Sequence, residues 1–236
     1  MANTNQILYD LLEQAVYQNQ TMQAKKLIEQ GASLKLDRGI NVLLRAAINN
    51  NNPDLVRYLL AKGSPLETNL AVDHEGGSYE NVLTLALYAK GHSIELLTIL
   101  LKAGADPNLS GQGERNIEQM PLLQANTNEE RRLLLQYGAD PNIFYTEPLL
   151  ITAVSTANQE LIELLIQSGA KFNIGKQGMV DSAILINKCK HEPDYKFVLD
   201  NAVDSKQQTI TAFLRQAGAV TFKEWCQQNL ATRSNL

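Results

Sequence analysis

The sequence is poor in several residue types, and each shortage excludes a class of protein. Only two cysteines, Cys189 and Cys226, occur in 236 residues, too few for the disulfide framework of a small secreted domain. We interpret both as packed or half-exposed thiols in a reducing compartment. Aromatic residues make up 6% of the chain, so we expect an aliphatic core. No window of 18 apolar residues occurs, which excludes an ordinary membrane-spanning helix.

The charge balance gives no sign of a polyanionic partner. Lys and Arg number 21 against 25 Asp and Glu, a formal net charge of −4, which favours neither nucleic acid nor an anionic membrane. The opening residues MANTNQILYD lack the basic and apolar regions of a cleaved secretion signal. We therefore expect a cytoplasmic protein, with delivery to a host cell without a cleaved signal peptide as the alternative destination.

An aliphatic run that ends in glycine and a small residue recurs along the chain. The glycines of these runs are Gly31, Gly63, Gly104, Gly138, Gly169 and Gly218. The first five are 32, 41, 34 and 31 residues apart, which indicates a repeat of about 33 residues. The interval of 41 predicts an inserted finger at 65–80. Glycine suits these positions because the residue just past a helix end often has positive φ.

Each repeat is predicted to contain two helices. The aliphatic residues before each glycine fall on one helical face, as Leu55, Val56 and Leu59 do. A second helical segment with small residues lies upstream, at 41–48, 81–88, 120–126 and 147–154. Helices this short need burial against neighbours to be stable. The pattern therefore predicts stacked helix–turn–helix units.

This unit resembles the ankyrin repeat. EPLLITA at 147–153, KGH at 90–92 and GADPN at 104–108 and 138–142 match the family's T-P-L-H-x-A-A, G-H and G-A-D-x-N patterns. The resemblance covers roughly residues 5 to 220 and implies an all-α ankyrin-repeat solenoid of about six units. The histidine of TPLH, which braces the turns in the family, is absent and is replaced by Leu44, Thr84, Leu123 and Leu150.

We predict a single ankyrin-repeat domain over 1–236. It comprises an N-terminal capping unit at 1–36, central repeats at 37–175 with the inserted finger, and a degenerate repeat with a C-terminal cap at 176–236. In the first capping unit, helices at 5–18 and 21–30 are expected to present a polar outer face.

Two registers remain open after residue 175. We favour a helix pair at 180–189 and 193–201, followed by a cap at 206–216 and 221–230 in which Trp225 packs onto the last helix pair. The alternative places one complete repeat at 197–218.

Groups that could catalyse a reaction are scarce. Asp73, His74 and Glu75 could form a weak metal site, but three consecutive side chains do not converge on one centre, so a solvated loop or partner contact is favoured. His92 is expected to be a structural turn residue, and Cys189, two residues from His191, to be packed rather than nucleophilic. No phosphate-binding glycine loop is present. We expect no enzymatic activity, no cofactor and no metal.

The resemblance implies binding of another protein through a concave face of loops and first helices. That role takes two forms: an adaptor or secreted effector, or an inhibitor or immunity-type protein that blocks a specific enzyme. A metal-binding or enzymatic module built on Asp73-His74-Glu75 is the rival of another class. We expect a scaffold that is monomeric when unbound and binds neither nucleic acid nor membrane.

Candidate contact residues are large or charged side chains on loop tips or at a first-helix exit. They are Arg38, Asp73, His74, Glu75, Tyr79, Tyr88, Arg115, Phe144 and Tyr145. The alternative for Phe144 and Tyr145 is that they fold back over their shortened loop.

Overall fold

The computed structural model describes residues 4–34, 42–66, 81–89, 91, 93–109, 120–144, 146–172, 185, 188–189, 192 and 195–231. Within these ranges the chain forms helices joined by turns and loops, with no β-strand. It divides into two compact units, Met1–Ala139 and Asp140–Leu236. The all-α ankyrin-type fold is confirmed, whereas the predicted domain boundaries at 36 and 175 stay predictions.

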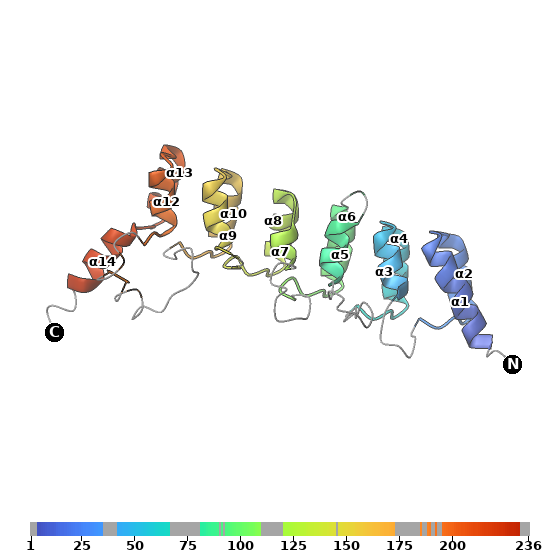
Figure 1. The fold of residues 1–236 in the computed structure, drawn as a ribbon. Helices are drawn as coiled ribbons and strands as arrows, with labels where there is room; N and C mark the ends of the chain where they lie inside the picture. The colour runs from blue at the N-terminus through green and yellow to red at the C-terminus, as the bar shows by residue number, and fades with distance from the viewer. Residues whose placement is uncertain are drawn as a thin grey trace. The chain divides into compact units, whose positions relative to one another are not determined.

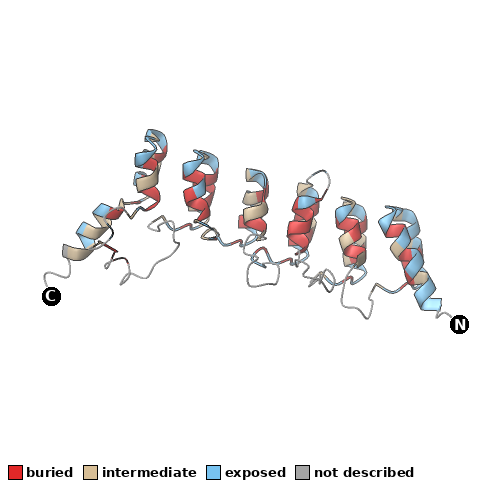
Figure 2. Cartoon of the chain, in the orientation of Figure 1, coloured by how far each residue is buried: buried red, intermediate tan, exposed pale blue. Residues whose placement is uncertain are grey.

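The first unit is a row of helix pairs (Figure 1). The pairs are α1 (Thr4–Tyr17) with α2 (Thr21–Glu29), α3 (Val42–Asn49) with α4 (Pro53–Ala61), α5 (Val82–Tyr88) with α6 (Ile94–Lys102), and α7 (Pro121–Gln124) with α8 (Asn128–Gln136). Each first helix packs on the first helix of the next pair, and the second helices pack in the same way. The buried sides of the helices therefore face one another within and between the pairs (Figure 2).

The described part of the second unit includes two helix pairs and a further helix. They are α9 (Leu149–Ser155) with α10 (Gln159–Gln167), α12 (Val198–Asp204) with α13 (Gln208–Gln216), and α14 (Phe222–Ala231). Helix α12 packs on α9 as the first helix of the next repeat.

The favoured register after residue 175 is therefore wrong, and the complete repeat at 197–218 is correct. The Asp200 carboxylate accepts the Phe197 backbone N–H at 2.8 Å, which starts α12 as a first helix at Val198. The expected helix at 193–201 cannot then be a second helix. Most of the expected helix at 180–189 lies outside the described residues.

Every second helix ends at a glycine in the left-handed region, as the repeat spacing predicts. Gly138 has φ of 92°, and the backbone N–H of Ala139 behind it donates to the Leu134 carbonyl at 3.0 Å. An added Cβ at Gly138 would meet no atom within 4 Å. The requirement for glycine is therefore set by the backbone angle rather than by space.

Substitutions at Gly138 should distinguish the cost of its backbone angle from any cost of side-chain volume to the free energy of unfolding. Gly138→Ala should lower the free energy of unfolding by about 1–2 kcal/mol, because a left-handed conformation costs an L-residue with a Cβ roughly that amount. Gly138→Val should cost more, and Gly138→Asn less, because asparagine tolerates this region. Urea unfolding of the three variants measures the order, and equal losses would contradict this account.

Asparagine side chains join successive repeats. The Asn52 amide donates to Asn19 Oδ1 at 2.6 Å and to Thr21 Oγ1 at 2.7 Å, while its Oδ1 accepts the Leu55 N–H at 2.9 Å. Asn50 Nδ2 donates to the Val16 carbonyl at 2.9 Å. The asparagine tract between α3 and α4 is therefore a brace as well as a turn.

The last asparagine of each GADPN motif makes a similar link. Asn108 Nδ2 donates to the Gly138 carbonyl at 2.8 Å, and Asn142 Oδ1 accepts the Lys171 N–H at 2.8 Å. Each bond reaches the end of the following repeat. Asparagine thus supplies bracing between repeats that lack the TPLH histidine.

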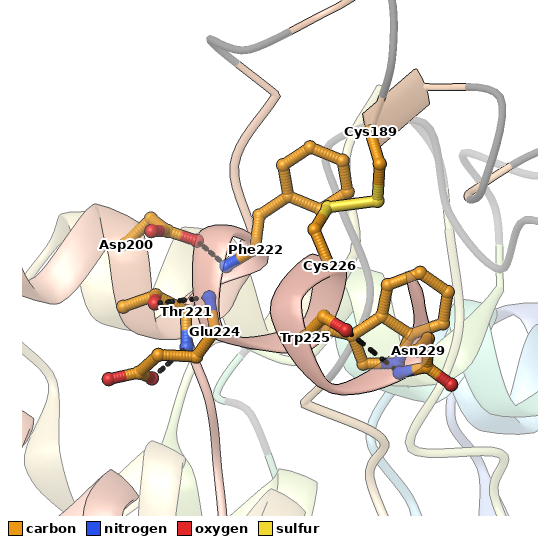
Figure 3. The surroundings of a disulfide bond; sticks show 8 residues. All are labelled: Cys189, Asp200, Thr221, Phe222, Glu224, Trp225, Cys226 and Asn229. Atoms are coloured by element: carbon orange, nitrogen blue, oxygen red, sulfur yellow. Dashed lines mark hydrogen bonds between the residues drawn. A yellow bond between two sulfur atoms is a disulfide. The ribbon is translucent and has the colours of Figure 1, made fainter. Parts of the chain in front are cut away.

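The interpretation of the two cysteines as thiols is wrong, because Cys189 and Cys226 form a disulfide bond (Figure 3). Helix α14 returns to the segment that contains Cys189, so that two Cα atoms separated by 37 residues lie 5.7 Å apart. Sequence reasoning treated each cysteine by itself and had no evidence that these segments meet.

An aromatic cluster accompanies the disulfide. Buried Leu185, Phe197 and Phe222 form its centre, and half-buried Tyr195 and Trp225 pack against them together with both cysteines. The rings of Phe197 and Trp225 meet edge to face, with centroids 6.1 Å apart. The prediction that Trp225 packs the last helix onto the preceding pair is confirmed. The core here is aromatic, against the expectation of an aliphatic core throughout.

Loss of the disulfide should destabilise the second unit. A bond that closes a loop of 37 residues restricts the unfolded chain enough to contribute about 4 kcal/mol in the chain-entropy model. The double variant Cys189→Ser, Cys226→Ser should therefore unfold at lower urea concentration than the oxidised protein. An unchanged midpoint would show that the bond does not stabilise the fold by restricting the unfolded chain.

Two carboxylates anchor the start of α14. Asp200 Oδ2 accepts the Phe222 N–H in addition to the Phe197 N–H, both at 2.8 Å, although burial raises the pKa of Asp200. Glu224 accepts Arg215 Nη1 at 2.7 Å and the Thr221 N–H at 2.8 Å. These bonds, that to Arg215 foremost, lower the pKa of Glu224 from 4.5 to about 2.

The stabilising effect of Glu224 should depend on pH. Its folded pKa is depressed, so its contribution is fully present above pH 4.5 and is lost as the pH falls toward about 2. Glu224→Gln should flatten the fall in melting temperature over this window. The difference should be small and should shrink in 1 M salt, because the ion pair is exposed. Identical acid profiles would contradict the assignment.

Candidate protein-binding surface

The first helices of the first unit form a face on which packing leaves few side chains exposed. In α5 every residue from Val82 to Leu87 is buried, and Tyr88 alone is exposed. On the neighbouring first helices, Arg45 of α3 and Gln124 of α7 are half-buried. We call the face made by α3, α5 and α7 the first-helix face. An exposed side chain there has no role in packing the helix that carries it.

Tyr88 is the most prominent residue of the first-helix face. Its side chain is 56% exposed, and its hydroxyl donates a hydrogen bond to Gln124 Oε1 on the next repeat. The ring is therefore held in one orientation while its surface stays open to solvent. Such an aromatic side chain can contact a partner with little loss of conformational freedom.

Phe144 lies in the second unit, just before α9. It pairs with Pro148 in an isolated antiparallel β-bridge, so the chain reverses between them. The Leu149 N–H donates to the Ile143 carbonyl at 3.2 Å and closes the turn. The Phe144 side chain remains 36% exposed, which leaves it accessible to a partner rather than folded away completely.

The structure places two of the nine sequence-predicted contact residues, Tyr88 and Phe144. The other seven lie outside the described residues: Arg38, Asp73, His74, Glu75, Tyr79, Arg115 and Tyr145. Residues 67–80 of the predicted finger and His92 also lie outside them. Their roles stay predictions.

Sequence reasoning missed Gln124 because its side chain was not large or charged. The contact with Tyr88 depends on α7 being a single turn, Pro121–Gln124, which places the amide at the helix end. The sequence signal that could have indicated it is the short spacing between the first-helix segment at 120–126 and the glycine at 138.

The N-terminal helix is less polar on its outside than expected. Leu11 lies eight residues before the positive-φ residue of its turn, as Leu43, Leu83 and Leu149 do in theirs. Those three are buried, whereas Leu11 is 46% exposed and Ile7 is 49% exposed. Two apolar side chains, Ile7 and Leu11, are therefore exposed on the capping helix, which was expected to present a polar outer face.

The described residues contain neither a metal-binding cluster nor a free thiol. No group of three His, Cys, Asp or Glu side chains that could hold a metal occurs among them. Both cysteines are in the disulfide, so neither is a nucleophile. A helix long and apolar enough to cross a membrane is also absent from the described part of the chain.

Comparison with known protein families agrees with the repeat pattern. Residues 12–111 match a family model of ankyrin repeats in three copies. Residues 12–111 therefore carry ankyrin repeats. The matched range begins in α1 and ends just after α6, within the first unit. The helix pairs α7–α8, α9–α10 and α12–α13 continue the same pattern beyond it.

Relatives with described functions share parts of this chain. A Danio rerio protein described provisionally as palmitoyltransferase ZDHHC13 is 28% identical over 154 residues, 63% of this chain and 22% of that protein. An ankyrin repeat protein of fowlpox virus (strain NVSL), FPV014, also described provisionally, is 26% identical over 139 residues, 58% of this chain and 30% of that protein. The chain therefore spans less than a third of either relative.

A solved structure shares the fold. Its title describes the Bd0816 predatory endopeptidase from Bdellovibrio bacteriovorus in complex with immunity protein Bd3460. The matched chain has a TM-score of 0.56 and 20% identity, over 87% of this chain and 97% of that one. At this identity the likeness establishes the fold alone. Ankyrin repeats are protein-interaction modules that are generally not enzymes.

Proposed function

We propose that the chain binds a protein partner through the first-helix face, without catalysing a reaction. The observation that carries the proposal is Tyr88, an exposed aromatic ring fixed by Gln124 on a face whose other side chains pack the repeats. Tyrosine is among the residue types that contribute most to interface energy. The rigid helix stack keeps the cost of ordering low when a partner docks.

Phe144 supports a second contact region on the second unit. It is exposed beside α9 in a turn closed by backbone pairing. Loops and first helices supply the binding residues of ankyrin repeats, and both Tyr88 and Phe144 fall in those elements. The seven predicted residues outside the described ranges are proposed as further contacts on the same grounds.

The partner's biological role divides the proposal into two forms. In the first, the chain is an adaptor or effector that recruits a protein. In the second, it is an inhibitor or immunity-type protein that blocks one enzyme. The fold it shares with a chain from an endopeptidase–immunity protein complex gives loose support to the second form. A metal-binding or enzymatic role for Asp73-His74-Glu75 is the rival, and metal analysis of the purified protein tests it.

The disulfide is evidence about the compartment in which the protein acts. The expectation of a cytoplasmic protein used the two free thiols as one of its grounds, and that ground is lost because both cysteines are in a disulfide. Disulfides persist mainly in oxidising compartments. We therefore favour a role outside the reducing cytoplasm, where an inhibitor of an extracellular enzyme would act.

The function is tested by placing a photo-crosslinking phenylalanine analogue at position 88 or at position 137. Tyr137 is the matched control, because it is also an exposed tyrosine of the first unit but lies at the end of the second helix α8. The oxidised protein is incubated with native extract and irradiated. Crosslinked proteins are identified by mass spectrometry after washing in about 0.5 M salt, where charge attraction is screened. A specific product at 88 alone is expected, and equal labelling at both positions would reject this face.

Affinity for the crosslinked partner should then depend on the ring and its orientation. Tyr88→Ala should raise the Kd about 30-fold, the equivalent of about 2 kcal/mol for an interface hot spot. Tyr88→Phe keeps the ring but loses the bond to Gln124, so a smaller loss is expected. Tyr137→Ala should leave the Kd unchanged. A Tyr88→Ala protein that binds normally would remove Tyr88 from the interface.

A further inference from the structure

Helix α14 is attached to the rest of the second unit at few points. None of the other described helices pairs with it, and its packing against them is slight. Phe222, at its first position, is its one deeply buried side chain; those of Trp225 and Cys226 are half-buried. Gln227 and Gln228 beyond them are exposed. The middle of the helix is therefore held chiefly by the disulfide and by the edge of Trp225.

The disulfide connects two segments that also meet in the aromatic cluster, where the Tyr195 and Phe222 ring centroids lie 5.0 Å apart. Cys189 belongs to the segment in which Lys188 pairs with Glu192 at 2.7 Å and lies over the Tyr195 ring at 4.6 Å. Cys226 belongs to α14, whose first residues are fixed to α12 and α13 through Asp200 and Arg215. Figure 3 shows the bond beside Phe222, with Trp225 on the neighbouring turn of the helix.

Both cysteines are only partly buried. A thiolate from solvent can therefore approach the bond, and exposed disulfides are the ones more readily reduced. By contrast, the ring of Phe197 beneath them is fully buried and that of Phe222 nearly so. The bond is thus a partly exposed disulfide that packs against a buried apolar cluster.

We propose that the Cys189–Cys226 bond is a redox latch that fastens α14 over the aromatic cluster, and that its reduction releases this helix while the α12–α13 repeat stays folded. The reductant is a dithiol. One of its thiolates attacks a sulfur of the bond and forms a mixed disulfide as the other cysteine leaves as a thiolate. Its second thiol then displaces the protein sulfur. Two electrons and two protons have passed to the protein, and the dithiol leaves as a disulfide.

The repeat beneath the latch has supports of its own. Helix α12 packs on α9 and α13, with Val198, Leu199 and Ala202 buried. Gly218 ends α13 with φ of 93°, as the other repeat glycines do. None of these contacts involves a cysteine, so reduction should act locally. Release of α14 would expose Phe197 on the repeat and Phe222 on the helix itself to solvent or to a partner.

The test uses Trp225, the one tryptophan of the chain. The full-length oxidised protein is treated with dithiothreitol under native conditions, and mass spectrometry counts the thiols released. Latch release predicts a red shift of Trp225 emission and at least tenfold faster hydrogen exchange in α14. Exchange in α12 and α13 should increase much less than in α14, because that repeat stays folded. Reoxidation should reverse both changes.

The variant Cys189→Ser, Cys226→Ser is the matched control, and it should show the released state without responding to dithiothreitol. Three results would overturn the proposal. The bond could resist reduction in the folded protein. Two free thiols could appear with no change in α14. The α12–α13 repeat could open together with α14, which would make the bond a structural staple instead of a latch.

Discussion

The structure depends on one constraint, which is that none of its short helices can stay folded without burial against the next pair. Helices of seven to nine residues are below the length at which backbone hydrogen bonding alone sustains a helix in water. In α5 this requirement occupies every side chain from Val82 to Leu87. The glycine turns and asparagine bonds between repeats set the spacing at which this burial is possible.

The same constraint limits where a binding site can form. Residues that pack the repeats are not available to a partner, so the exposed residues of the first helices are few. Tyr88 is one of them, and its bond to Gln124 links its orientation to the repeat stacking itself. A mutation that changes the packing of α7 on α5 should therefore act on binding through this tyrosine without any direct contact to the partner.

At α14 the repeated aliphatic burial gives way to a different arrangement. The edge-to-face contacts among Phe197, Phe222 and Trp225, together with the disulfide, hold a helix that pairs with none of the other described helices. The chain has few aromatic residues, and several of them lie in the cluster beside α14. The C-terminal helix therefore responds to redox conditions in a way that the repeats do not.

The repeats could be predicted from the sequence because their signals are local. Glycine spacing and aliphatic periodicity indicated the helix pairs, and the GADPN motifs marked their ends. The register near Phe197 could not be predicted, because PDYKFVLD resembles the second helix PDLVRYLL at 53–60, whereas the contact of α12 with α9 makes it a first helix. The disulfide and the Tyr88–Gln124 bond depend on which distant segments meet, and neither has a local signal.

The most direct test of protein binding through the first-helix face is hydrogen exchange of the oxidised chain alone and in its purified complex. The account predicts slower exchange in peptides that contain α5 and α7, around Tyr88 and Gln124, while α4 and α6 on the second-helix side change little. Protection confined to the second helices would contradict it, as would a complex whose first helices exchange at their free rates.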